Sequence, residues 1–163
     1  MTKIVQVVNE EIMVKDILSK YARNVEFLGD DLQDVEQMGG FGSQVIHLAS
    51  FSNQYHDIAG LVRAGANINA IGDLGLRPLH YAVLGGAFNA VRFLLKIGAD
   101  AATENEYGET PAQMAHILGE VKLEQMLLHI AGQTFFSYDG GPTARERWLA
   151  FRSIQQANFW SDD

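Results

Sequence analysis

The sequence predicts an all-α fold of stacked helical repeats, and three observations lead to this prediction. Similar runs of residues begin at Gln44, Arg77 and Thr110, each 33 residues after the one before, with a glycine two residues ahead of every run. Proline is the second residue of two of these runs, a position that suits the first turn of a helix. Leu-rich segments that end in glycine recur with the same spacing. Periods of this length are typical of solenoids, in which each unit packs against its neighbours.

Each repeat is expected to contain a short helix, a turn and a second helix. In the second repeat, Leu79 and Ala82 fall on one face of the first helix. Val91 and Leu94 fall on one face of the next. The glycine after each Leu-rich segment favours the left-handed conformation that ends a helix. A unit this small cannot bury its apolar face alone, so stacking has to make the core continuous.

Residues 39–130 resemble ankyrin repeats, because the second copy carries the opening Pro78-Leu79-His80 and the closing Gly98-Ala99-Asp100 of that family. The other two copies depart from the opening at Gln44-Val45 and at Gln113. The resemblance divides the segment into the repeats 39–71, 72–104 and 105–130. It implies an ankyrin-repeat solenoid of helix–turn–helix–loop units.

The sequence gives little support for catalysis. The resemblance implies that His47 and His80 hydrogen-bond backbone across a turn. His116 and Glu120 lie four residues apart, but the His-Glu-x-x-His pattern of metalloproteases is absent. So are a Gly-x-Ser-x-Gly motif and cysteine, the residue of thiol nucleophiles and of many zinc sites. We therefore expect no enzymatic activity, no cofactor and no metal.

Charge and hydropathy restrict the partners. The chain has 20 acidic and 12 basic residues, and its net charge of −8 disfavours nucleic acid and attracts a basic protein surface. No apolar run approaches the roughly 20 residues that span a membrane. The start of the chain is a poor signal peptide, because Gln6 and Glu10 interrupt its apolar stretch. We expect a cytoplasmic protein that binds neither nucleic acid nor membrane.

Residues 1–38 lack the repeat motif and are predicted to form a divergent helical N-terminal cap. One helix is expected to start near Asn9, and a second to lie within residues 28–35. Residues 24–38 hold five acidic side chains and no basic one. This segment is either a solvated outer face of the cap or an acidic docking patch.

Residues 131–163 are predicted to form a helical C-terminal extension that packs on or near the last repeat. Gly132 is expected to end the last repeat helix, and residues 139–142 to form a turn. A helix is then predicted from Ala144 to about Asn158.

Aromatic residues are concentrated in this extension, which holds seven of the sixteen in the chain. They are Phe135, Phe136, Tyr138, Trp148, Phe151, Phe159 and Trp160. Trp148, Phe151 and Ile154 are expected on one stripe of the helix. The aromatic extension either caps the exposed end of the stack or presents a binding surface.

The resemblance implies that partners contact the loop tips and the inner helices, on the concave face of the stack. The candidate partner-binding residues at these variable positions are Phe41, Phe51, Asp73, Leu74, Leu76, Leu84, Glu106, Tyr107, Glu109 and Leu118. Most are apolar and three are acidic, which suits a partner whose apolar anchor is surrounded by Lys or Arg. The alternative is that the aromatic extension or the N-terminal segment folds over this face.

The function predicted from these features is a non-enzymatic protein-interaction module that holds one partner on its concave face. Small acidic ankyrin proteins resemble some bacterial immunity proteins, so an inhibitor of a toxin or effector is one form of this hypothesis. The alternative is a scaffold that self-associates through its aromatic extension. A monomer is favoured and a dimer is the alternative state.

Overall fold

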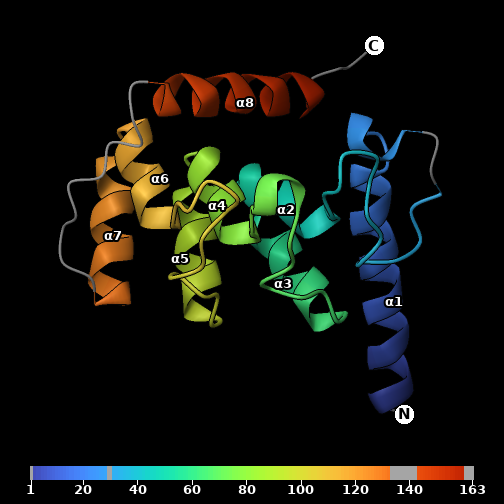
Figure 1. Ribbon diagram of the computed structural model, residues 1–163. Helices are drawn as coiled ribbons and strands as arrows, with labels where there is room; N and C mark the ends of the chain where they lie inside the picture. Colours follow the sequence, from blue (N-terminus) through green and yellow to red (C-terminus); the bar gives the residue numbers. More distant parts are fainter. Residues whose placement is uncertain (1, 29–30, 133–142, 160–163) are drawn as a thin grey trace.

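The computed structural model of the protein describes residues 2–28, 31–132 and 143–159. Every regular element in these ranges is a helix, which confirms the predicted all-α fold. Three helix pairs stack side by side in chain order (Figure 1). They are α2 (Val45–Phe51) with α3 (Tyr55–Arg63), α4 (Pro78–Leu84) with α5 (Phe88–Lys96), and α6 (Pro111–Leu118) with α7 (Val121–Ala131).

A side chain in the first turn closes the start of each inner helix. The ring Nδ1 of His47, like that of His80, accepts a hydrogen bond from the backbone N–H three residues earlier. Gln113 does the same with its amide oxygen in the third repeat. With Nδ1 accepting, the other ring nitrogen donates: His47 Nε2 to the Ala70 carbonyl and His80 Nε2 to the Glu109 carbonyl. His47 and His80 therefore join the first and the second repeat, respectively, to the loop that follows each of them.

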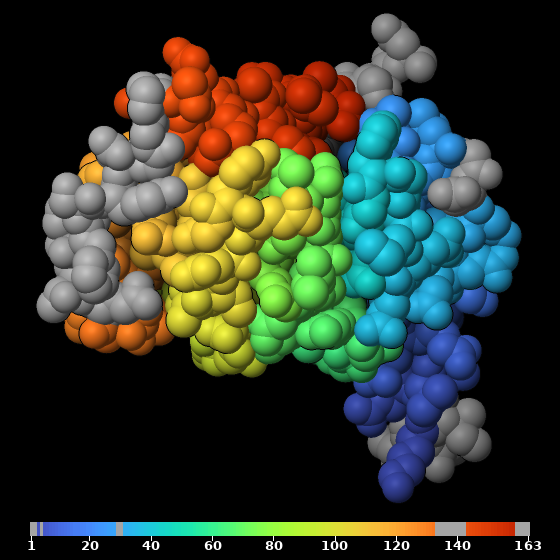
Figure 2. All heavy atoms as spheres, in the orientation of Figure 1, coloured from blue at the N-terminus to red at the C-terminus, as the bar shows by residue number. Residues whose placement is uncertain are grey.

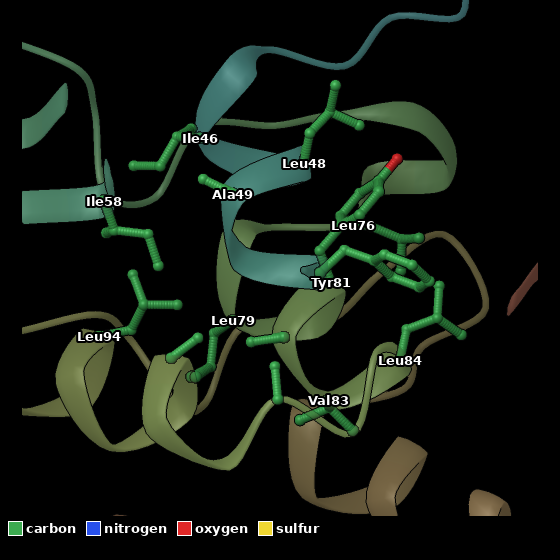
Figure 3. Close-up of a cluster of buried hydrophobic side chains, with 14 of the residues drawn as sticks. Ile46, Leu48, Ala49, Ile58, Leu76, Leu79, Tyr81, Val83, Leu84 and Leu94 are labelled. Atoms are coloured by element: carbon green, nitrogen blue, oxygen red, sulfur yellow. The ribbon is translucent and has the colours of Figure 1, made fainter. Parts of the chain in front are cut away.

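The core runs without a break through the helix pairs. Figure 3 shows part of it, in which Ile46 and Leu48 of α2 and Leu79 and Val83 of α4 belong to one cluster of buried side chains. All four side chains are almost completely buried. Burying one aliphatic side chain of this size contributes about 1.5–3 kcal/mol. The stack is thus held by contacts between neighbouring repeats.

The N-terminal segment differs from the prediction. One helix, α1 (Thr2–Tyr21), starts before Asn9, and it is followed by the short 3₁₀ helix η1 (Val25–Phe27). The second helix predicted within residues 28–35 is wrong, because residues 31–38 contain turns and irregular backbone. Asp34 accepts a hydrogen bond from the backbone N–H two residues later, a local bond that competes with helix formation.

The hairpin loops between repeats turn at glycine. The glycines two residues ahead of the repeated runs are Gly42, Gly75 and Gly108, and all have positive φ angles, between 69° and 89°. Residues with a Cβ rarely adopt this conformation, which explains the repeated glycine. Neighbouring loops touch, since the backbone N–H of Glu106 donates to the carbonyl of Leu74 at 3.0 Å.

The C-terminal helix, α8 (Ala144–Phe159), has nearly the predicted bounds, and Gly132 ends α7 in a left-handed conformation as expected. Helix α8 lies across the stack, from α6 to the end of α1 (Figure 1). The predicted stripe is wrong at Ile154, which is 57% exposed, while Gln155 is buried. At 100° per residue, position 155 returns closer than position 154 to the side of Trp148. The turn predicted at 139–142 and the aromatics Phe135, Phe136, Tyr138 and Trp160 lie outside the described residues.

Candidate protein-binding surface

The structure divides the predicted site residues into two groups. Phe41, Glu106 and Tyr107 are exposed, and Asp73 and Leu74 are half-buried. The exposed fractions of Phe41 and Tyr107 are 60% and 43%. The buried group is Phe51, Leu76, Leu84, Glu109 and Leu118.

The expectation of an exposed concave face is therefore wrong for the buried group. Leu76 and Leu84 belong to the same apolar core as Tyr81 (Figure 3). The backbone carbonyl of Leu84 also accepts a hydrogen bond from Arg152 of α8. The alternative that the aromatic extension folds over this face describes the structure, since α8 occupies it.

Trp148 anchors α8 to the third repeat. Its side chain has no exposed surface, and its indole N–H donates to Glu109 Oε2 at 2.7 Å. The ring meets Tyr107 and Phe151 edge to face, with centroids 5.6 Å and 6.1 Å away. Phe151 in turn lies edge-on to Tyr81 of α4 at 6.4 Å. Aromatic pairs in this geometry add stability beyond the area they bury.

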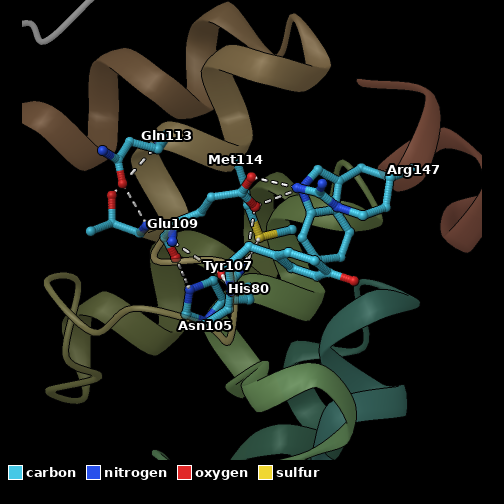
Figure 4. Close-up of polar contacts among 9 residues, drawn as sticks. His80, Asn105, Tyr107, Glu109, Gln113, Met114 and Arg147 are labelled. Atoms are coloured by element: carbon cyan, nitrogen blue, oxygen red, sulfur yellow. Dashed lines mark hydrogen bonds and ion pairs between the residues drawn. The ribbon is translucent and has the colours of Figure 1, made fainter. Parts of the chain in front are cut away.

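Glu109 is the centre of a polar cluster beneath α8 (Figure 4). The guanidinium of Arg147 donates to Glu109 Oε1 at 2.6 Å, and the amide of Asn105 donates to Oε2 at 3.2 Å. The Arg147 guanidinium also stacks over the ring of Tyr107, 3.8 Å from its centroid. Glu109 was predicted to meet basic residues of a partner, but here it binds an arginine of its own chain. The arginines within the predicted C-terminal helix are the feature of the sequence that could have indicated this pairing.

The other half of α8 is fixed at two further points. Arg152 donates from Nε to the Leu84 carbonyl at 2.6 Å and from its terminal nitrogen to Glu120 at 2.9 Å. The carbonyl of Asn158 accepts a bond of 3.4 Å from the side chain of Asn24, which lies just before η1. One helix thereby contacts the third repeat, the second repeat and the N-terminal segment.

The predicted site residues that remain accessible form what we call the hairpin ridge, defined as Phe41, Asp73, Leu74, Glu106 and Tyr107. The loops that carry them lie side by side below α8 (Figure 2). A Cβ built on Gly42 would stand 3.9 Å from the backbone nitrogen of Asp73, so the first two loops are adjacent. The bond between Leu74 and Glu106 joins the second loop to the third.

The acidic side of the ridge continues inward to Glu26. Its carboxylate accepts hydrogen bonds from the backbone N–H groups of Phe41, at 3.2 Å, and Ser43, at 2.7 Å. Burial, with a smaller contribution from the charge of Asp73, raises the pKa of Glu26. Glu26 therefore fixes the loop that presents Phe41.

Leu74 holds an unusual backbone conformation at the centre of the ridge. Its φ and ψ of 54° and 25° lie in the left-handed region, in the short 3₁₀ helix η2 (Asp73–Gly75). Among the described residues other than glycine, Asn53 alone shares a positive φ, and Asn tolerates it well. For a leucine this conformation costs on the order of 1–2 kcal/mol. Such strain is characteristic of residues presented for binding.

A pocket of about 650 Å³ lies where α1, the turns after α2 and α4, and the end of α8 meet. Phe51, one of the predicted site residues, forms part of its wall. The polar part of the pocket lining comes from Lys20, Arg23 and Asn24, and from the side-chain amides of the other Asn and Gln residues that line it. Lys20 is already paired with Asp57 at 2.7 Å.

The described part of the chain contains no group of three His, Asp or Glu side chains that could hold a metal ion. Within the same residues, no helix is both long enough and apolar enough to cross a membrane. His47 and His80 are buried, and burial lowers the pKa of each to about 4. These two histidines are structural.

Comparison with known families agrees with the repeat architecture. Residues 61–115 match the family model for ankyrin repeats (many copies). Residues 61–115 carry ankyrin repeats. These repeats indicate a protein–protein interaction module, and ankyrin repeat proteins are typically non-enzymatic. No curated protein matches the chain.

Proposed function

We propose that this ankyrin repeat protein is non-enzymatic and binds one protein partner on its hairpin ridge. The partner would present an apolar anchor to Phe41 and Leu74 and place Lys or Arg side chains near Asp73 and Glu106. An apolar centre with a charged rim is the usual anatomy of a protein interface. The net charge of −8 would speed the approach of a basic partner.

The observation that carries this proposal is the conformation of Leu74. A glycine or asparagine would relieve the strained backbone, yet a large apolar side chain is placed there, partly packed against the core and partly accessible on the ridge. Phe41, 60% exposed on the neighbouring loop, enlarges the apolar centre. The exposed carboxylate of Glu106 supplies part of the rim.

The finer form of the proposal is a dedicated inhibitor. An acidic ridge suits a partner whose own functional cleft is basic, and occupying that cleft would block it. A toxin or effector enzyme is a partner of this kind. The proposed setting is the cytoplasm, with the chain acting as a monomer.

The test is capture of the partner by the tagged full-length chain, followed by titration calorimetry with the purified partner. Phe41→Ala and Glu106→Lys should each weaken binding about tenfold or more, as expected for residues at the centre and rim of an interface. Phe88→Ala is the matched control, because Phe88 is an exposed phenylalanine on α5, away from the ridge. Equal affinity of all three variants would exclude the ridge as the binding site.

A further inference from the structure

We propose that the face covered by α8 is a binding site for a helix that carries arginine and tryptophan, and that a partner's helix can displace α8 from it. The ridge proposal does not require this, because the ridge stays accessible with α8 in place. Helix α8 acts here as a resident occupant, and its contacts define the chemistry of its competitor.

The first requirement of the site is a cation beside an indole. Glu109 has no exposed surface, and its carboxylate is met by Arg147, Trp148 and Asn105. Only Asn105 among these three comes from the repeats. Without α8, the carboxylate would keep one hydrogen bond in an apolar surrounding that includes Met114 (Figure 4). With α8 displaced, the carboxylate would be open to solvent on this side, and a helix that covers it again has to bring a cationic donor, because burying the charge without a partner is costly.

The second requirement is a further arginine in helical register. Arg152 uses the Leu84 carbonyl and Glu120, acceptors that belong to two neighbouring repeats. In a helix that rises about 1.5 Å per residue, Arg147 and Arg152 are separated by about 8 Å along the axis. An extended peptide would separate them by about 17 Å. The two anchor points therefore favour a helix over an extended segment.

The contacts of α8 are confined to one side, as in a bound ligand. Ala144, Trp148 and Gln155 are buried against the stack, and Phe151 is half-buried. Leu149 and Ile154 point away and are exposed. Beneath α8, Tyr81 completes its own hydrogen bond with Ser43 of the first repeat at 2.7 Å. The polar groups of Tyr81 and Ser43 are thus satisfied by the repeats themselves.

The test uses a fluorescent peptide of residues 143–159 and the full-length chain. In the wild-type protein, the tethered α8 competes with the peptide at high effective concentration, so binding should be weak. The double variant Arg147→Ala/Trp148→Ala weakens the resident helix and should bind the peptide at least tenfold more tightly by fluorescence anisotropy. Adding Glu109→Gln should remove that gain, whereas Leu149→Ala in the otherwise wild-type chain should leave binding weak. A folded double variant that binds no better than wild type overturns the proposal.

A second measurement on the wild-type chain does not depend on the fold of any variant. If α8 is displaceable, its amides should exchange with solvent through local opening, faster than the amides of α4. In the double variant, the amides of the bound peptide should become protected, while the amides of the displaced α8 should exchange rapidly. If α8 and α4 exchange only together, through global unfolding, α8 is an inseparable part of the fold and the proposal is wrong.

Discussion

The indole N–H of Trp148 donates a 2.7 Å hydrogen bond to the buried carboxylate of Glu109, 39 residues earlier in the chain. This bond joins the C-terminal helix to the loop that opens the third repeat. Trp148→Phe keeps most of the apolar contact but leaves Glu109 short of one donor. Losing a buried hydrogen bond in this way should lower the free energy of unfolding by about 1–3 kcal/mol.

Urea unfolding measures this change, and a double-mutant cycle with Glu109→Gln isolates the pair. We expect the two substitutions to be non-additive by at least about 0.5 kcal/mol, because the residues are in direct contact. Leu149→Ala, on the exposed side of α8, is the control and should change stability little. Additive effects of the pair would show that the bond contributes nothing in solution.

The buried histidines predict that acid destabilises the fold. Burial lowers the pKa of His47 and His80 to about 4, from an ordinary value of 6.5. Between these two values the unfolded chain binds more protons than the folded protein, so the free energy of unfolding falls as the pH is lowered. At about 1.4 kcal/mol per pKa unit, each histidine accounts for a loss on the order of 3 kcal/mol by pH 4. Glu26, whose pKa is raised by burial, opposes this trend.

The measurement is the free energy of unfolding as a function of pH, for the wild type and for His80→Gln. Glutamine is a suitable replacement for His80, because Gln113 already closes the first turn of α6 in the way that His80 closes that of α4. The variant should be less stable at pH 7 but should depend less steeply on pH between 6.5 and 4. An unchanged slope would contradict the assignment of the pH dependence to His80.

The left-handed backbone at Leu74 predicts that glycine is more stabilising than alanine at this position, the reverse of their usual order. Leu74→Gly and Leu74→Ala remove the same apolar contacts, but only alanine retains a Cβ in the left-handed region. We expect the glycine variant to be more stable than the alanine variant by about 1 kcal/mol. Thermal unfolding of the two proteins side by side tests this, and a more stable alanine variant would mean that the loop does not hold this conformation.

The close contact between Gly85 and Phe51 leaves no room for a side chain where the first two repeats meet. A Cβ built there would lie within van der Waals overlap of the backbone carbonyl of Phe51, although φ at Gly85 is an ordinary −78°. Gly85→Ala should therefore destabilise the stack by about 1–3 kcal/mol through overpacking alone. Gly40→Ala is a suitable control, because the nearest atom to its Cβ would be 3.7 Å away. Equal stability of the two variants would show that the turns are farther apart.

Much of the repeat architecture was predictable because its signals are local and periodic. The glycines ahead of each run turn the loops, and His47 and His80 close the turns in the way that the resemblance implied. The bounds of α8 were predictable for the same reason, from residues near its ends. Most of these features depend on interactions among residues close in the sequence, whereas His47 and His80 reach carbonyls 23 and 29 residues away in positions that the repeat fixes.

The surface was harder to predict because it depends on where distant segments meet. Glu109 and Leu84 hold variable positions of the repeat, and nothing in their neighbourhood shows that Trp148 and Arg152 cover them. The second helix predicted within residues 28–35 failed because Asp34 bonds locally to backbone, and polar turn bonds leave no periodic signal. The ridge residues Phe41 and Tyr107 were predicted to be exposed, and they are.

The path of α8 changes the connectivity of the whole stack. In an array of repeats each unit touches its neighbours, so either end can fray while the rest stays folded. Helix α8 instead ties Glu109 and Glu120 of the third repeat to Leu84 of the second and to Asn24 before the first. The chain thus forms a closed circuit of contacts in place of an open row, and loosening any one repeat also strains the link between the other two.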